Sequence, residues 1–210
     1  MTIPVFAHVA AVSCFIPAAV GLWYWKQSPA AMRVFTLFCL YSTLHLVMEF
    51  TLGRLGISNQ FLMNYHQIIE LLCILYLFHA RVTERRTQLF FRALAALYSV
   101  LWLVNKFLYE DPERFSEGIT IAAMLVLMTA SVIVLNMSVR TAAGPVTQHS
   151  TFWIALAVLL YGAGTVIITG FSNTILAMGM EAFDTFWHIN WGFTILTNLL
   201  YARSFRCPSF

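Results

Sequence analysis

Three pairs of a histidine and a carboxylate stand out in this sequence, because each pair lies in an otherwise apolar segment. The pairs are His45/Glu49, His66/Glu70 and Asp184/His188. The two members of each pair are four residues apart, a spacing that places both side chains on one face of a helix. Ionisable side chains at membrane depth are costly and persist mainly where they face a bundle interior or a wet cavity. The three pairs therefore predict a buried polar site.

Histidine nitrogens and carboxylate oxygens are ligands that zinc prefers, and a catalytic zinc ion needs three protein ligands and one open position for water. Helices of one bundle can bring such ligands to a common centre. The predicted ligands are His45, His188 and either Glu70 or Asp184, with His66 as a further candidate. Glu49 or the remaining acid is the expected base when zinc-bound water attacks the ester or amide carbonyl of a membrane lipid.

The composition indicates an integral membrane protein. Of the 210 residues, 60% are hydrophobic and only 10% are charged, and the mean hydropathy is +0.77. Soluble domains usually carry about 25% charged residues. The net charge of +3 is small, and the basic residues are spread over separate connections rather than gathered in one stripe. This pattern excludes a nucleic-acid partner.

Hydropathy divides the chain into seven apolar segments, each long enough to cross a bilayer as a helix. The predicted spans are 3–25, 33–53, 60–80, 88–108, 117–138, 151–171 and 184–204. Clusters of polar and turn-forming residues separate them, such as Lys-Gln-Ser-Pro at 26–29 and Ala-Gly-Pro at 143–145. We therefore expect an all-α integral membrane fold in which residues 1–210 form one seven-transmembrane helix bundle.

The distribution of Lys and Arg predicts the orientation of this bundle. Most of the twelve basic residues fall in the first, third and fifth connections and in the C-terminal tail. Because cytoplasmic connections are enriched in Lys and Arg, the N-terminus is expected outside and the C-terminus in the cytoplasm of a bacterial inner membrane or another plasma membrane. All three histidine–carboxylate pairs then fall in the outer half of their helices. The expected site is a cavity lined by the first, second, third and seventh spans.

Three short motifs carry a further signal. They are Tyr-Ser-Thr-Leu-His at 41–45, Ile-Glu-Leu-Leu at 69–72 and Asp-Thr-Phe-Trp-His at 184–188. Together with the number of spans, they resemble the superfamily of alkaline ceramidases and adiponectin-receptor-like proteins. The resemblance implies a seven-helix membrane hydrolase in which His45 and His188 bind zinc, Glu70 is the acid and Ser42 is a polar neighbour. Asp184 stands where the family has the first histidine of its last motif, and Glu70 stands where it has an aspartate.

Two other functions fit the same residues. In one, the chain is a membrane sensor or receptor that binds a small or lipidic ligand in the outer cavity and signals through a partner protein. In the other, two facing histidines are the axial ligands of a haem in a redox protein. Retinal-type photoreception is not expected, because the seventh span holds no lysine. The purely structural alternative is that the histidines join helices by hydrogen bonds and that Asp184 caps the last helix.

Overall fold

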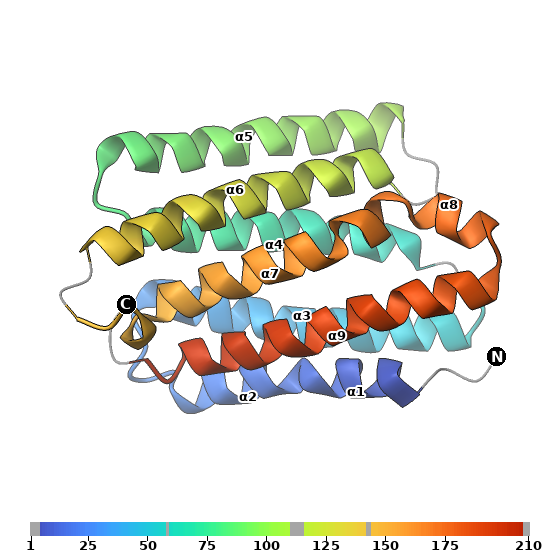
Figure 1. Cartoon of the computed structure of the whole chain (residues 1–210), viewed down its shortest axis with the longest axis horizontal. Coiled ribbons are helices and arrows are strands. Elements are labelled where there is room, and N and C mark those ends of the chain that lie inside the picture. The colour runs from blue at the N-terminus through green and yellow to red at the C-terminus, as the bar shows by residue number, and fades with distance from the viewer. Residues whose placement is uncertain (1–4, 58, 110–115, 142–143, 208–210) are drawn as a thin grey trace.

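The computed structural model describes residues 5–57, 59–109, 116–141 and 144–207, and helices make up most of it (Figure 1). The helices are α1 (Val5–Ser13), α2 (Phe15–Trp23), α3 (Ala30–Arg54), α4 (Gln60–Arg81), α5 (Arg85–Leu108), α6 (Glu117–Thr141), α7 (Ser150–Gly170), α8 (Ser172–Ala177) and α9 (Met180–Ser204). A short 3-10 helix, η1 (Val146–Gln148), precedes α7. The predicted all-α fold class is confirmed.

Six segments of the described chain are long and apolar enough to cross a membrane. They are α1 together with α2, and the five helices from α3 to α7. Each coincides with one of the first six predicted spans to within a few residues. The seventh predicted span is also helical, as α9, but it is not among these six. The apolar helices indicate a protein that is integral to a membrane.

The first predicted span contains two helices, because a proline interrupts it. Pro17 has no N–H group to donate to the carbonyl of Ser13, and its ring crowds that carbonyl. The helix α1 therefore ends at Ser13. Side chains from two other helices bind the interruption. Thr43 Oγ1 of α3 donates to the Cys14 carbonyl oxygen at 3.1 Å. Asn198 Nδ2 of α9 donates to Ser13 Oγ at 2.9 Å.

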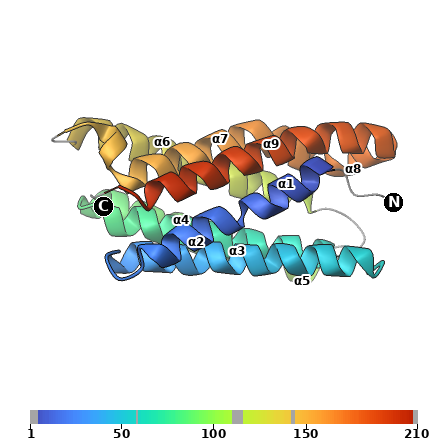
Figure 2. The same ribbon diagram turned by 90° about the horizontal axis from the view of Figure 1, so that it is seen from below.

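The helices close into a ring around the long axis of the bundle. Seen from below in Figure 2, α7 and α9 lie in one layer and α3 lies in the other. Going round the ring, α3 packs against α4, α4 against α6, α6 against α7, and α7 against α9. The α1–α2 pair closes it by contacting both α9 and α3, while α5 packs outside the ring against α4 and α6.

An apolar core fills the half of the ring near the described C-terminal end of the chain. Phe35 of α3, Phe78 of α4 and Phe91 of α5 are fully buried in this core. The Phe35 ring meets the edge of Tyr201 with centroids 4.9 Å apart, and it stacks on Phe205 at 5.4 Å. Close packing of this kind gains dispersion energy from many small contacts. It leaves the opposite half of the same helices to position the polar residues.

The connection between the sixth and seventh predicted spans contains the short helix α8. Ile175 of α8 is buried, and α8 packs against the start of α9. Gly179 then adopts a φ of 109°, a conformation that side chains with a Cβ rarely reach. Glycine at this position allows the chain to turn from α8 into α9 and return through the bundle.

Candidate functional site: a polar cavity inside the bundle

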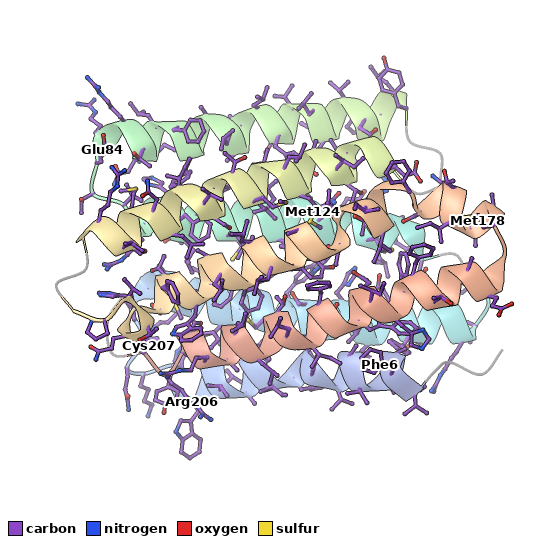
Figure 3. All side chains as sticks on the ribbon, viewed as in Figure 1. Phe6, Glu84, Met124, Met178, Arg206 and Cys207 are labelled. Carbon is purple, nitrogen blue, oxygen red and sulfur yellow. The ribbon has the colours of Figure 1, made fainter. Side chains whose placement is uncertain are left out.

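A cavity of about 580 Å³ lies inside the ring, mainly in the half where α1 begins. Five of the predicted site residues line it, namely Ser42, His45, Glu49, His66 and Glu70. The predicted wall of α1, α3, α4 and α9 is joined by the beginning of α6 and the end of α7. Met124 of α6, labelled in Figure 3, lines the cavity near the middle of the bundle. No described residue of α5 contributes to the lining.

Two of the histidines meet inside this cavity. The rings of His45 and His66 stack with centroids 4.4 Å apart and an angle of 26° between their planes. Tyr41 stacks on His66 at 5.6 Å, so aromatic rings from α3 fix the position of the α4 histidine. A short connection makes α3 and α4 antiparallel. Glu49 therefore lies about 6 Å along the axis from the histidine pair toward the connection, and Glu70 lies about 6 Å away in the opposite direction.

The contacts of its two ring nitrogens show which nitrogen of His45 carries the hydrogen. Its Nε2 lies 2.9 Å from the carbonyl oxygen of Leu62, and because a carbonyl only accepts, Nε2 carries the hydrogen. Its Nδ1 lies 3.7 Å from Oε2 of Glu49. His45 thus ties α3 to the beginning of α4 through one nitrogen and presents the other to a carboxyl group. Only Nδ1 is free of a backbone bond.

Four polar atoms of the cavity wall are buried without a hydrogen-bond partner. They are Ser42 Oγ, His66 Nδ1, Asn190 Oδ1 and Thr197 Oγ1. A buried donor or acceptor without a partner costs about 1–3 kcal/mol relative to a satisfied one. These atoms come from three helices and border one space. A hydrated or ligand-filled cavity would satisfy all four at once.

The third predicted pair lies elsewhere. His188 is exposed, its ring stacks on Phe6 at 6.0 Å, and it meets the edge of Trp191 at 4.9 Å. Trp191 lines the cavity, whereas His188 does not. The structure therefore brings His45 and His66 together, whereas His188 is exposed on α9 and stacks on Phe6, which Figure 3 labels. Asp184 belongs to α9, and its side chain lies outside the described part of the molecule.

The described residues do not fit the zinc site expected from the sequence. Among them, no group of three His, Cys, Asp or Glu side chains is placed to hold a metal ion. His188 does not face His45, and His45 Nε2 is bound to a backbone carbonyl. A haem held by two histidines fits no better. Axial imidazoles point their nitrogens at one iron from opposite sides, whereas the His45 and His66 rings lie face to face 4.4 Å apart.

Sequence reasoning placed the seventh span at the cavity through Asp184 and His188, but it missed the residues of α9 that line the wall. Asn190, Thr194, Thr197 and Tyr201 all line the cavity. They recur at intervals of four, three and four residues, which is the period of one helix face. This stripe of polar residues in an apolar segment could have predicted which face of the last helix lines the cavity. The participation of α6 and α7 had weaker signals, single Thr and Ser residues that often bond only to their own helix.

Fold and site together define an all-helical membrane protein with a polar internal cavity. Comparison of the chain with protein-family models, with curated proteins and with solved structures found no match. The function must therefore be inferred from the residues of the cavity.

Proposed function

We propose that this chain is a membrane protein that binds a small, hydrogen-bonding ligand in its internal cavity. The observation that carries the proposal is the set of four buried, unpartnered polar atoms around one space of about 580 Å³. Pockets for small molecules usually measure about 300–1,000 Å³ and combine an apolar wall with a few placed polar groups. This cavity has the appropriate size and such a wall.

The proposal includes seven membrane spans, with α9 as the seventh. A helix of 25 residues is about 37 Å long, which exceeds the roughly 30 Å of bilayer hydrocarbon. The polar residues of α9 that line the cavity need not contact lipid. The Lys and Arg distribution supports an N-terminus outside and a plasma-type membrane. The cavity then lies in the outer half, where a ligand from outside or from the outer leaflet enters. A sensor of this kind transmits its state to a partner protein.

Hydrolysis of a lipid amide or ester is the second candidate function. It is favoured by Ser42, the His45–Glu49 pair and Glu70, which line the same cavity. In that function His45 Nδ1 would exchange a proton with a reacting hydroxyl or water, and Glu49 would orient the ring. The resemblance to alkaline ceramidases, and the bound zinc that it implies, stay predictions. Incubation of purified protein with a ceramide and with a fatty-acid ester, and assay of released fatty acid with and without added zinc, distinguishes this function from binding alone.

Two matched substitutions test the binding proposal. Ala10 of α1 is buried and lines the cavity, whereas Ala19 of α2 is exposed on the outside of the bundle. Ala10→Phe therefore fills the cavity, and Ala19→Phe adds the same ring to the outer surface. Thermal unfolding of purified protein against a panel of polar metabolites measures binding. We expect a compound that stabilises the wild type and the Ala19 variant in a saturable way but has no effect on the Ala10 variant.

Access to the cavity gives a test that needs no ligand. In a variant with Cys14→Ser and with Cys39, Cys73 and Cys207 replaced by Ala, Ser42→Cys supplies one thiol in the wall. We expect the small neutral reagent methyl methanethiosulfonate to modify this thiol, and Ala10→Phe to slow the reaction at least tenfold. A thiol that reacts no faster in the open cavity than in the filled one contradicts the proposal.

A further inference from the structure

The charged groups around the cavity have one sign. Glu49 and Glu70 line it, and no Lys or Arg is among the described lining residues. Glu70 makes no hydrogen bond or ion pair with another described residue, and the ion-pair partner of Glu49 is His45 rather than a permanent cation. A carboxylate at membrane depth needs a counter-charge or a proton. The described part of the cavity wall supplies no permanent counter-charge.

Two basic residues near the ends of α3 and α5 lie away from the cavity lining. Arg54, at the end of α3, is exposed. Lys106 of α5 places its Nζ 4.8 Å from the ring centre of Tyr65, which is 43% exposed. Since α5 packs outside the ring, this lysine does not reach the cavity. The field inside the cavity therefore attracts positive charge.

Aromatic rings complete the wall. Tyr161 of α7 and Trp187 and Trp191 of α9 line the same space. The faces of such rings attract cations, and the attraction grows when the cation is removed from water. The unpartnered Oδ1 of Asn190 and Oγ1 of Thr197 add acceptors for N–H groups, and Thr197 is only 7% exposed. A carboxylate, aromatic faces and neutral acceptors together match a protonated amine or a quaternary ammonium group.

We infer that the ligand of this cavity is a small organic cation, with Glu70 as its charge partner and Glu49 as a second anchor. The inference rests on the proposed function and specifies its ligand class. A metal cation fits less well, because the described residues include no cluster of three ligands. Glu49 and Glu70 are separated by about 12 Å along the helix axes, because each lies one step of four residues, about 6 Å, from the histidine pair and the two lie in opposite directions. Linear diamines therefore have a partner for each end.

Charged thiol reagents test the sign of the electrostatic potential inside the cavity. The Ser42→Cys variant in the cysteine-replaced background is treated with a trimethylammonium methanethiosulfonate and with its sulfonate counterpart. The ratio of the two rates cancels the intrinsic reactivity of the thiol. The matched control is Ile57→Cys, because Ile57 is 51% exposed in the connection after α3. We expect the cation-to-anion ratio at Ser42→Cys to exceed that at Ile57→Cys by about tenfold or more, since a carboxylate attracts one reagent and repels the other.

The substitutions Glu70→Gln and Glu49→Gln show which carboxylate causes the preference for the cationic reagent. Glu70→Gln is expected to lower the ratio at Ser42→Cys at least fivefold and to leave the ratio at Ile57→Cys unchanged. Glu49→Gln is expected to lower it less, because His45 lies beside that carboxyl group. A ratio at Ser42→Cys that equals the control, while the neutral reagent still reacts, overturns the cation inference and leaves the ligand cavity intact. A thiol that no reagent reaches overturns both proposals.

Three compounds with the same four-carbon chain test the ligand class directly. Putrescine is a dication, 1,4-butanediol is neutral and succinate is a dianion. We expect putrescine alone to stabilise the wild type against thermal unfolding and to slow modification of Ser42→Cys, and both effects to disappear in Glu70→Gln. Protection by butanediol or succinate, or equal protection by putrescine in the Glu70 variant, overturns the inference. Choline in place of putrescine shows whether one positive end suffices.

Discussion

The two halves of this bundle are built from the same helices but have opposite interiors. Toward the described C-terminal end, Phe35, Phe78 and Ile154 are fully buried in the apolar core. Toward the beginning of α1, the interior holds His66, Glu70 and a cavity of about 580 Å³. The helix α3, for example, passes from Phe35 in the core to His45 and Glu49 at the cavity. One half thus contains the packed apolar core, and the other half contains the cavity with its histidines and carboxyl groups.

The difference also explains where the small side chains and the helix interruption lie. Ala7 and Ala10 of α1 face the cavity and leave its volume open. The break at Ser13 and Cys14 lies beside the cavity, since Cys14 and the following Pro17 both line it. The following tests compare the halves by equal substitutions, in order of decreasing expected effect.

Phenylalanine truncation gives the largest contrast. Phe35 is 0% exposed and touches the rings of Tyr201 and Phe205. Phe35→Ala is expected to lower the free energy of unfolding by about 3 kcal/mol or more, because it leaves a cavity in packed surroundings. Phe50→Ala, beside the existing cavity, is expected to cost about 1 kcal/mol, since it removes fewer contacts. Unfolding in mixed detergents measures both, and equal losses would contradict the division into two halves.

Glycine substitution tests the seam between α7 and α9. A Cβ at Gly164 of α7 would overlap the ring of Phe193, whereas a Cβ at Gly192 of α9 would meet nothing within 4 Å. Gly164→Ala is expected to destabilise the protein by about 1–3 kcal/mol through overpacking. Gly192→Ala is expected to leave stability unchanged or raise it by up to about 1 kcal/mol, because alanine favours the helix. Thermal unfolding of the two variants is the measurement.

Threonine-to-valine substitution separates a satisfied hydroxyl from an unsatisfied one. Thr43 Oγ1 donates to the carbonyl of Cys14 across helices, and Thr197 Oγ1 has no partner in the described structure. Thr43→Val is expected to cost about 1–2 kcal/mol, because the partly buried carbonyl of Cys14 at the helix break loses a donor that it shares with the Cys39 carbonyl. Thr197→Val should change stability by less than about 0.5 kcal/mol but weaken putrescine binding. A stability loss in Thr197→Val as large as that in Thr43→Val would show that the hydroxyl is already satisfied.

The smallest expected effect is on the alkylation rate of Cys207. The same residue tests on which side of the membrane the C-terminus lies. This cysteine follows α9, where burial raises the pKa of its thiol and the neighbouring Arg203 opposes the rise. A raised pKa leaves less thiolate at neutral pH, so alkylation should be several-fold slower than at Ile57→Cys and should accelerate as the pH rises. In sealed vesicles, an impermeant maleimide should reach Cys207 only from the cytoplasmic side. Labelling from the outside would contradict an internal C-terminus.

The sequence by itself determined the class of the molecule. Low charge and long apolar segments left only a helical membrane protein, since each span must satisfy its own backbone hydrogen bonds in lipid. The four-residue spacing also placed Glu49 on the same helix face as His45, and Glu70 on the same face as His66, because helical period fixes which side chains of one helix share a face. The break in the first span was not predicted, because the hydropathy of residues 3–25 is continuous, although Pro17 is its physical cause.

Tertiary structure alone decided which faces meet. The spacing of Asp184 and His188 is the same as that of the other pairs, yet α9 turns His188 outward and Asn190 and Thr197 inward. The rotation of a helix about its axis depends on its packing against neighbours, here the close approach of α9 to α7 at Gly164, and local sequence does not encode it. The same packing brought α6 and α7 to the cavity wall and left α5 outside. It gave the cavity carboxylates with no lysine or arginine among the lining residues that the structure describes.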